Sequence, residues 1–122
     1  MERSLSGSGT TLLNENQLHD LVRVAGKDGT REILEAFWES TEGLIDLMRL
    51  HVSNSDTQSA ASTAHAIKGS AANVGAQSLH EKAQLFETFC RTQELANAAD
   101  VEAIAELFEL TRTVFEQELA RI

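Results

Sequence analysis

The absence of proline is the feature that most restricts the fold of this 122-residue chain. Folds built from many short strands need frequent turns, and proline and glycine are the residues that mark those turns. The chain has no proline and seven glycines, and five of the glycines fall within the first 43 residues. The sequence therefore favours long helices joined by short connections over a β-sandwich or a β-barrel.

Apolar residues recur at helical spacing in five stretches of the sequence. The first pattern ends at Gly26, the second runs from about residue 30 to residue 51, and the fifth begins at about Asp100. Ser55 followed three residues later by Gln58 has the spacing of a capping box, which predicts the start of the third helix. The expected apolar faces comprise Leu18, Leu21, Val22, Ala25, Ile33, Leu34, Phe37, Trp38, Leu44, Ile45, Met48, Val52, Ala60, Ala64, Ile67, Ala71, Val74, Leu79, Ala83, Leu85, Phe86, Phe89, Cys90, Val101, Ile104, Phe108, Thr111, Phe115 and Ile122.

We expect an all-α fold, in which long helices pack as an antiparallel up-down four-helix bundle with a short additional N-terminal helix against one end. Residues 1–11 are rich in serine, glycine and threonine and are expected to form a mobile N-terminal segment. Residues 12–122 form a single domain by this interpretation, because no linker composition interrupts them. A start at Met1 and an end at Ile122 favour a free-standing protein.

The charge balance and the cysteine count exclude several classes of partner and site. The chain carries 10 Lys and Arg against 19 Asp and Glu, a net charge of −9, whereas nucleic acids and anionic membranes attract basic proteins. The single cysteine, Cys90, excludes an internal disulfide and a multi-cysteine metal site. No apolar run reaches the ~18 residues that span a bilayer, and the N-terminus lacks a signal-peptide core. The sequence predicts a cytoplasmic protein without a metal, a nucleic acid or a membrane as partner.

One histidine on the third predicted helix stands among unusually small residues. Helical geometry at about 100° per residue places His65 on the exposed side. Ala61, Gly69 and Ala72 lie around it on that side, and Lys68 is its one large neighbour. A solvated helix face normally carries long polar side chains, so this bare surface indicates contact with another molecule.

Gly69 strengthens this interpretation. Glycine inside a helix costs ~1 kcal/mol relative to alanine, and here it falls one turn after His65. The missing side chain would let another protein approach the imidazole closely, and Lys68 at i+3 would place an ammonium beside an anion bound there. An accessible ring nitrogen beside a cation suits a phosphoryl group on histidine. The alternative is an ordinary surface histidine on a helix of alanine and serine.

The stretch from His65 to Ala76 reads His-Ala-Ile-Lys-Gly-Ser-Ala-Ala-Asn-Val-Gly-Ala. It resembles the histidine-containing phosphotransfer (HPt) domain of phosphorelays, whose pattern is His-x-x-Lys-Gly followed by small residues and a glycine about six positions on. The resemblance implies that His65 carries the phosphoryl group, that Lys68 neutralises its charge and that Gly69 leaves room for a partner. Gly75 would permit the turn into the next helix.

The resemblance also implies a hydrogen-bonding residue on the following helix, at the position of Glu87. A carboxylate there would fix the tautomer and the orientation of the ring. Ser70 and Gln84 are further candidates for this site. The expected partner surface around Lys68 is small and apolar, and it comprises Ala61, Gly69, Ala72 and Ala76.

HPt domains are phosphocarriers, and this chain has no phosphate-binding loop or kinase signature that would make it an enzyme. The implied partners are receiver domains of response regulators and a hybrid or sensor histidine kinase, with Mg²⁺ expected in the receiver and no cofactor in this chain. We expect a monomer, because four helices can close one core. Two other functions fit the same residues: a helical adaptor that binds a partner through the His65 face without phosphorylation, and the phosphoacceptor domain of a larger histidine kinase.

Overall fold

Four long helices make up most of the chain. The computed structural model describes residues 12–92 and 94–122. The helices are α1 (Glu15–Ser53), α2 (Thr57–Val74), α3 (Gln77–Arg91) and α4 (Ala98–Arg121). No strand occurs among the described residues, which confirms the predicted all-α class. The segment predicted to be mobile, residues 1–11, lies outside them.

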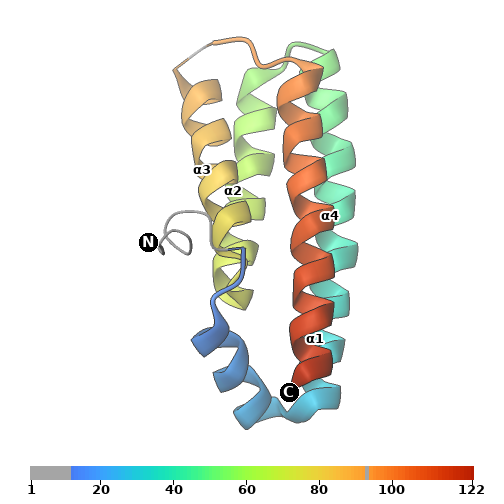
Figure 1. Ribbon diagram of the computed structural model, residues 1–122. Coiled ribbons are helices and arrows are strands. Elements are labelled where there is room, and N and C mark those ends of the chain that lie inside the picture. The colour runs from blue at the N-terminus through green and yellow to red at the C-terminus, as the bar shows by residue number, and fades with distance from the viewer. Residues whose placement is uncertain (1–11, 93) are drawn as a thin grey trace.

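The helices stand side by side, and the chain direction alternates from each helix to the next (Figure 1). α1 packs against α2 and α4, and α3 packs against the same two neighbours, so the four helices surround one core. The most extensive contact joins α2 and α3. Small residues allow this close approach, among them Ala64 and Ala71 of α2 and Ala83 of α3, which are fully buried. None of the described helices is long and apolar enough to cross a membrane.

α1 contains a kink where the sequence predicted the end of a first helix. Gly26 has φ 79° and ψ 170°, outside the helical range, and glycine adopts this conformation without the steric penalty that other residues meet. The segment before Gly26 lies across the end of the bundle at which α2 passes into α3 (Figure 1). There the Asn14 backbone N–H donates to the Gly75 carbonyl oxygen at 2.8 Å, and Leu18 is fully buried.

A side-chain cap and a glycine mark the two ends of α2. Its N-cap is Asp56, whose carboxylate accepts a hydrogen bond from the Ser59 N–H at 3.1 Å. The predicted capping box of Ser55 and Gln58 is wrong by one residue, because Ser55 has φ 55° and belongs to the turn before the helix. At the other end, Gly75 adopts the left-handed φ of 85° that the predicted turn requires.

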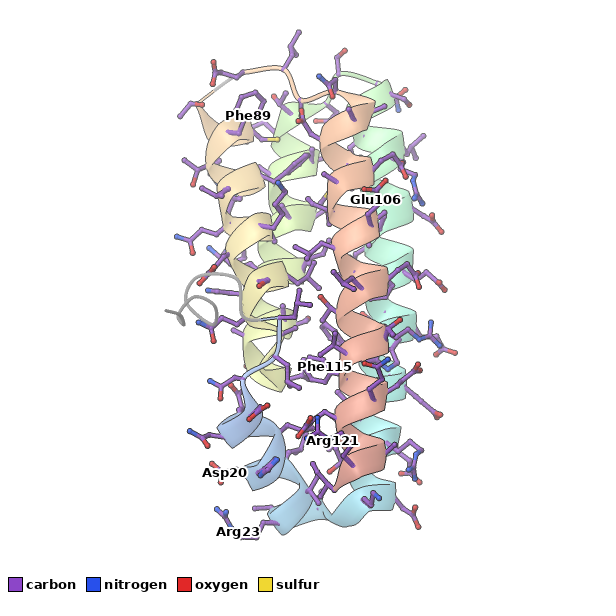
Figure 2. All side chains as sticks on the ribbon, viewed as in Figure 1. Asp20, Arg23, Phe89, Glu106, Phe115 and Arg121 are labelled. Atoms are coloured by element: carbon purple, nitrogen blue, oxygen red, sulfur yellow. The ribbon has the colours of Figure 1, made fainter. Side chains whose placement is uncertain are left out.

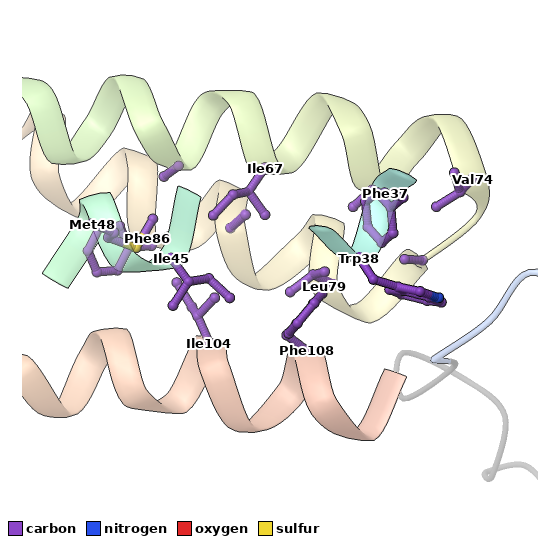
Figure 3. Packing of buried hydrophobic residues seen from close by; sticks show 14 of the residues in the cluster. Phe37, Trp38, Ile45, Met48, Ile67, Val74, Leu79, Phe86, Ile104 and Phe108 are labelled. Atoms are coloured by element: carbon purple, nitrogen blue, oxygen red, sulfur yellow. The ribbon is translucent and has the colours of Figure 1, made fainter. Parts of the chain in front are cut away.

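The core combines aliphatic and aromatic side chains from all four helices (Figure 3). Trp38 makes edge contacts with three rings, at centroid distances of 5.0 Å to Phe37, 5.9 Å to Phe108 and 5.5 Å to Phe115. Most of the predicted core residues are buried. Five are exposed instead, four because they lie at the edge of a buried stripe and one because it follows the last helical residue: Ala25, Ile33, Leu85, Phe89 and Ile122.

Candidate functional site

His65 lies in the middle of α2, and 64% of its side chain is exposed. Gly69 and Ala72, one and two turns farther along, are exposed on the same side of the helix. A methyl group added at Gly69 would meet no neighbouring side chain within 4 Å, so packing inside the protein does not explain this glycine. The surface around the histidine is therefore open at these positions.

The prediction of the partner surface is wrong for two residues. Ala61 and Ala76 are fully buried, so a partner cannot reach them. Ala61 lies two helical turns before Lys68, on the flank of α2 from which Lys68 reaches α3. Ala76 is the N-cap of α3, and its N–H donates to the Ala71 carbonyl oxygen at 2.9 Å within the turn. A helical projection gives the direction of a side chain, but it does not show which neighbouring helix covers it.

A single buried carboxylate joins the site residues of α2 to α3. Glu87 has only 10% of its side chain exposed. Its Oε2 lies 3.1 Å from His65 Nδ1 and 2.9 Å from Arg91 Nε, and its Oε1 lies 2.8 Å from Lys68 Nζ. The structure thus brings together His65, Lys68 and Glu87, across the two helices that pack most extensively.

The environment of Glu87 keeps its carboxyl group ionised. Burial raises the pKa of this carboxyl, but hydrogen bonds from Lys68, Arg91 and His65 and the charge of Lys68 outweigh burial and hold the pKa at about 2. An ionised carboxylate can only accept hydrogen bonds, so we assign the proton to His65 Nδ1, which donates. This assignment leaves Nε2 of the neutral ring without a proton and with its lone pair free.

Arg91 completes the surroundings of Glu87, and the sequence analysis did not single it out. It lies one helical turn after Glu87 on α3, and the i,i+4 spacing of glutamate and arginine is the signal that could have found it. By contrast, Ser70 is half-buried and Gln84 is exposed. Neither side chain is among the hydrogen-bond partners of His65 and Glu87, so the geometry does not support these two candidates.

Gln17, in the segment before the kink, caps the end of α2. Its Nε2 donates to the carbonyl oxygens of Ala72 at 2.8 Å and Asn73 at 3.0 Å. His80 of α3 is held against the same helix, because its Nδ1 lies 3.1 Å from the carbonyl oxygen of Lys68. No local pattern indicated these contacts, since each joins residues on different elements.

Charge is distributed unevenly over the helices. α1 has eight acidic and four basic residues and α4 has six acidic and two basic, so each has a net charge of −4. α2 and α3 together have Lys68, Lys82 and Arg91 against Glu81 and Glu87, a net charge of +1. Although the chain as a whole is acidic, the two helices that carry the site are not.

Comparison with known families decides where this arrangement belongs. A family model described as "Hpt domain" matches residues 32–122, about three quarters of the chain. The chain belongs to the Hpt domain family. Hpt domains are the histidine phosphotransfer carriers of phosphorelays, so the function that the sequence resemblance implied is confirmed at this level.

Two solved structures share the fold of this Hpt domain. Histidine-containing phosphotransfer protein B (HptB) from Pseudomonas aeruginosa PAO1 has a TM-score of 0.82 and 28% sequence identity, covering 92% of this chain and 97% of that one. A rice protein described as a histidine-containing phosphotransfer protein has a TM-score of 0.76 and 22% identity, covering 94% of this chain and 84% of that one. The rice protein supports the fold alone. No curated protein matches the chain.

Proposed function

We propose that His65 is the phosphorylated residue of this Hpt domain and that Nε2 carries the phosphoryl group. The observation that carries the proposal is the hydrogen bond between His65 Nδ1 and ionised Glu87, which leaves Nε2 as the nucleophile. Nε2 attacks the phosphorus of an aspartyl phosphate on a receiver domain, the N–P bond forms as the P–O bond breaks, and the aspartate carboxylate leaves. The reverse reaction returns the phosphoryl group to an aspartate.

Glu87 stabilises the charge that the reaction places on the ring. When Nε2 takes the phosphoryl group while Nδ1 keeps its proton, the imidazole becomes positively charged, and a carboxylate 3.1 Å away offsets that charge. Because Glu87 is buried, its interaction with the ring is screened less than it would be at an exposed site.

Lys68 and Arg91 both hold Glu87, but they stand in different places relative to His65. Lys68 is three residues after His65 on the same helix, whereas Arg91 approaches from α3. We expect Lys68 to turn its ammonium toward the phosphoryl oxygens when the group arrives, while Arg91 keeps Glu87 oriented. Two cations on one carboxylate therefore let Lys68 neutralise the phosphoryl charge without leaving a buried charge unpaired.

The partner surface of this proposal is the exposed line of His65, Gly69 and Ala72. The partner is the receiver domain of a response regulator, and a hybrid or sensor histidine kinase supplies the phosphoryl group to the relay. The acidic pocket of the receiver and its Mg²⁺ meet the two helices whose net charge is +1, and this chain contributes no cofactor. Transfer is catalysed jointly with the partner.

The scaffold for this exchange is a cytoplasmic, monomeric, antiparallel up-down bundle, in which the segment before Gly26 serves as a short extra helix. Two observations support the up-down arrangement: the helices enclose one core, and they alternate in direction (Figure 1). Sedimentation of the purified chain tests the monomer, and microscopy of a tagged chain tests the compartment.

Mixing the chain with a phosphorylated receiver domain and Mg²⁺ tests the phosphotransfer. We expect acid-labile, base-stable phosphate on the wild type and on His19→Gln, and none on His65→Gln. Phosphorus NMR should place the group on Nε2. Label on His65→Gln would place the chemistry at another histidine. Absence of label on the wild type, both with receivers and with the small donor phosphoramidate, would favour an adaptor that binds its partner through the same face without phosphorylation.

A further inference from the structure

A polar hollow of about 170 Å³ lies at the corner where α2 ends and α3 begins, next to the His65 face. Its volume compares with ~15 Å³ for one water molecule, so it has room for a side chain. Three separate parts of the chain form its walls: the segment before Gly26, the end of α2 and the first turns of α3. The residues that line it are Asn14, Gln17, Ala72, Gly75, Gln77 and His80.

The hollow is continuous with the proposed partner surface. Ala72 belongs to both, and it lies seven residues after His65, which is two turns and about 10.5 Å along the same side of α2. Exposed Gly69 lies between them. A receiver domain that covers His65, Gly69 and Ala72 therefore extends over the mouth of the hollow.

Two of the polar atoms fixed around the hollow are hydrogen-bond acceptors, and a third is a donor. Asn14 Oδ1 accepts the Gln17 backbone N–H at 3.1 Å, which leaves Nδ2 as the donor atom of that amide. Gln17 uses its amide nitrogen on the carbonyl oxygens of Ala72 and Asn73, which leaves its Oε1 as the free atom of that amide. The Nδ1 of His80 donates to the Lys68 carbonyl oxygen, so Nε2 of the neutral ring is an acceptor. A group that enters the hollow satisfies the two acceptors only if it donates hydrogen bonds, and a side-chain amide can in addition accept one from Asn14 Nδ2.

We propose that this hollow, defined as the corner pocket, takes a hydrogen-bond-donating side chain of the receiver domain and selects which receivers exchange with His65. Lysine, asparagine and glutamine have the required donors. Asn14 and Gln17 precede residue 32, where the family match begins, so part of the wall comes from outside the region that the family model describes. This inference rests on the proposed phosphotransfer function and names the feature of the partner that the function requires.

Gln77→Trp tests the corner pocket, because Gln77 is exposed, lines the hollow and takes no part in the contacts of His65 or Glu87. Gln117→Trp, at an exposed position of α4, is the matched control. Transfer from several phosphorylated receivers is measured as KM and kcat, and phosphoramidate provides a donor that needs no docking surface. Circular dichroism and urea unfolding confirm that each variant is folded.

We expect Gln77→Trp to raise KM by about tenfold for receivers that place a donor in the pocket, the equivalent of one lost hydrogen bond. kcat and labelling by phosphoramidate should stay unchanged, and Gln117→Trp should match the wild type. An unchanged KM for every receiver, or an equal rise for all of them, would overturn the selection role. Failure of the wild type to be labelled at His65 by any donor would overturn the phosphotransfer function itself, and this result is distinguishable from the others.

Discussion

The pair of helices α2 and α3 differs from the pair α1 and α4 in side-chain size and in charge. α2 and α3 pack through fully buried alanines, whereas α1 and α4 contribute Trp38, Phe108 and Phe115 to an aromatic cluster. Figure 2 shows Phe115 turned into the bundle, and on the same helix Glu106 is an exposed carboxylate. α1 and α4 thus supply large core side chains and an acidic surface. α2 and α3 pack closely against each other and are nearly neutral in charge.

This difference shows that the composition of the whole chain does not describe its site. The net charge of −9 comes mostly from α1 and α4, which contribute −4 each. A partner with an acidic pocket would be repelled by those helices but meets a net charge of +1 on α2 and α3. Close packing of the alanine-rich pair also holds Glu87 within hydrogen-bond distance of His65.

The largest contrast between the two pairs should appear in stability. Phe115→Ala removes a fully buried ring from the aromatic cluster and should lower the free energy of unfolding by ~3–5 kcal/mol. Ala71→Gly, an equally buried change in α2, should cost ~1–2 kcal/mol through helix propensity and one lost methyl. Urea unfolding measures both. Equal losses would show that the core is not divided in this way.

The next effect is the pH dependence of stability, and it should come from the pair α2 and α3, which holds Glu87. The pKa of Glu87 is about 2 in the folded protein, against 4.5 when unshifted, so its contribution to stability is complete above pH 4.5 and is lost as the pH falls toward 2. We expect a loss of ~1–3 kcal/mol over this window, reduced by the partial exposure of Lys68 and Arg91. Urea unfolding of Glu87→Gln should show a free energy of unfolding that falls by that much less than the wild type's over the same pH range. Glu106→Gln, at an exposed position on α4, should behave as the wild type.

Two helical glycines allow a matched comparison of function and stability. A methyl group added at Gly69 or Gly43 meets no neighbouring side chain within 4 Å, so either change to alanine should stabilise the domain by ~0.5–1 kcal/mol. Only Gly69→Ala should slow phosphotransfer from a receiver, because only Gly69 lies beside His65. Thermal unfolding and transfer kinetics check the pair. Normal transfer in Gly69→Ala would remove the argument that the partner needs this space.

The smallest effect should be on association with a receiver. Lys82→Glu reverses a charge on α3, and Lys27→Glu makes the same change on α1. We expect the first to slow association about threefold at low salt and the second to have less effect, because Lys82 belongs to the pair of helices that carries the docking face and Lys27 does not. Stopped-flow measurements at low and high salt separate them. Equal slowing by both variants would mean that total charge, and not its distribution, controls the encounter.

The sequence was sufficient to predict the site residues whose positions depend on the geometry of one helix or one turn. His65, Lys68 and Gly69 follow one another at helical spacing, so their common face could be read directly from their positions. Gly75 was predicted at a turn because a left-handed φ favours glycine, and its φ is 85°. Glu87 was placed opposite His65 by the family resemblance, and the structure shows the two within 3.1 Å.

The sequence was insufficient for residues whose burial or contacts depend on how the helices pack together. Ala61 and Ala76 were placed on the partner surface, but a neighbouring helix and a tight turn cover them. Arg91 acts on a residue of its own helix, yet its importance depends on what Glu87 contacts across the interface. Gln17 could not be found, because its partners lie 55 and 56 residues away in the sequence.

The hydrogen bonds from Gln17 close a loop of the chain that contains nearly all of α1. Closing a long loop costs conformational entropy before its contacts form, so we expect these hydrogen bonds to form after the local turns of α2. If the segment before Gly26 detaches, the Ala72 carbonyl oxygen keeps only the 3.4 Å hydrogen bond from the Gly75 N–H, and we expect the last turn of α2 to fray first. Hydrogen exchange at that turn would therefore report how firmly the first residues of α1 hold the far end of the helix that carries His65.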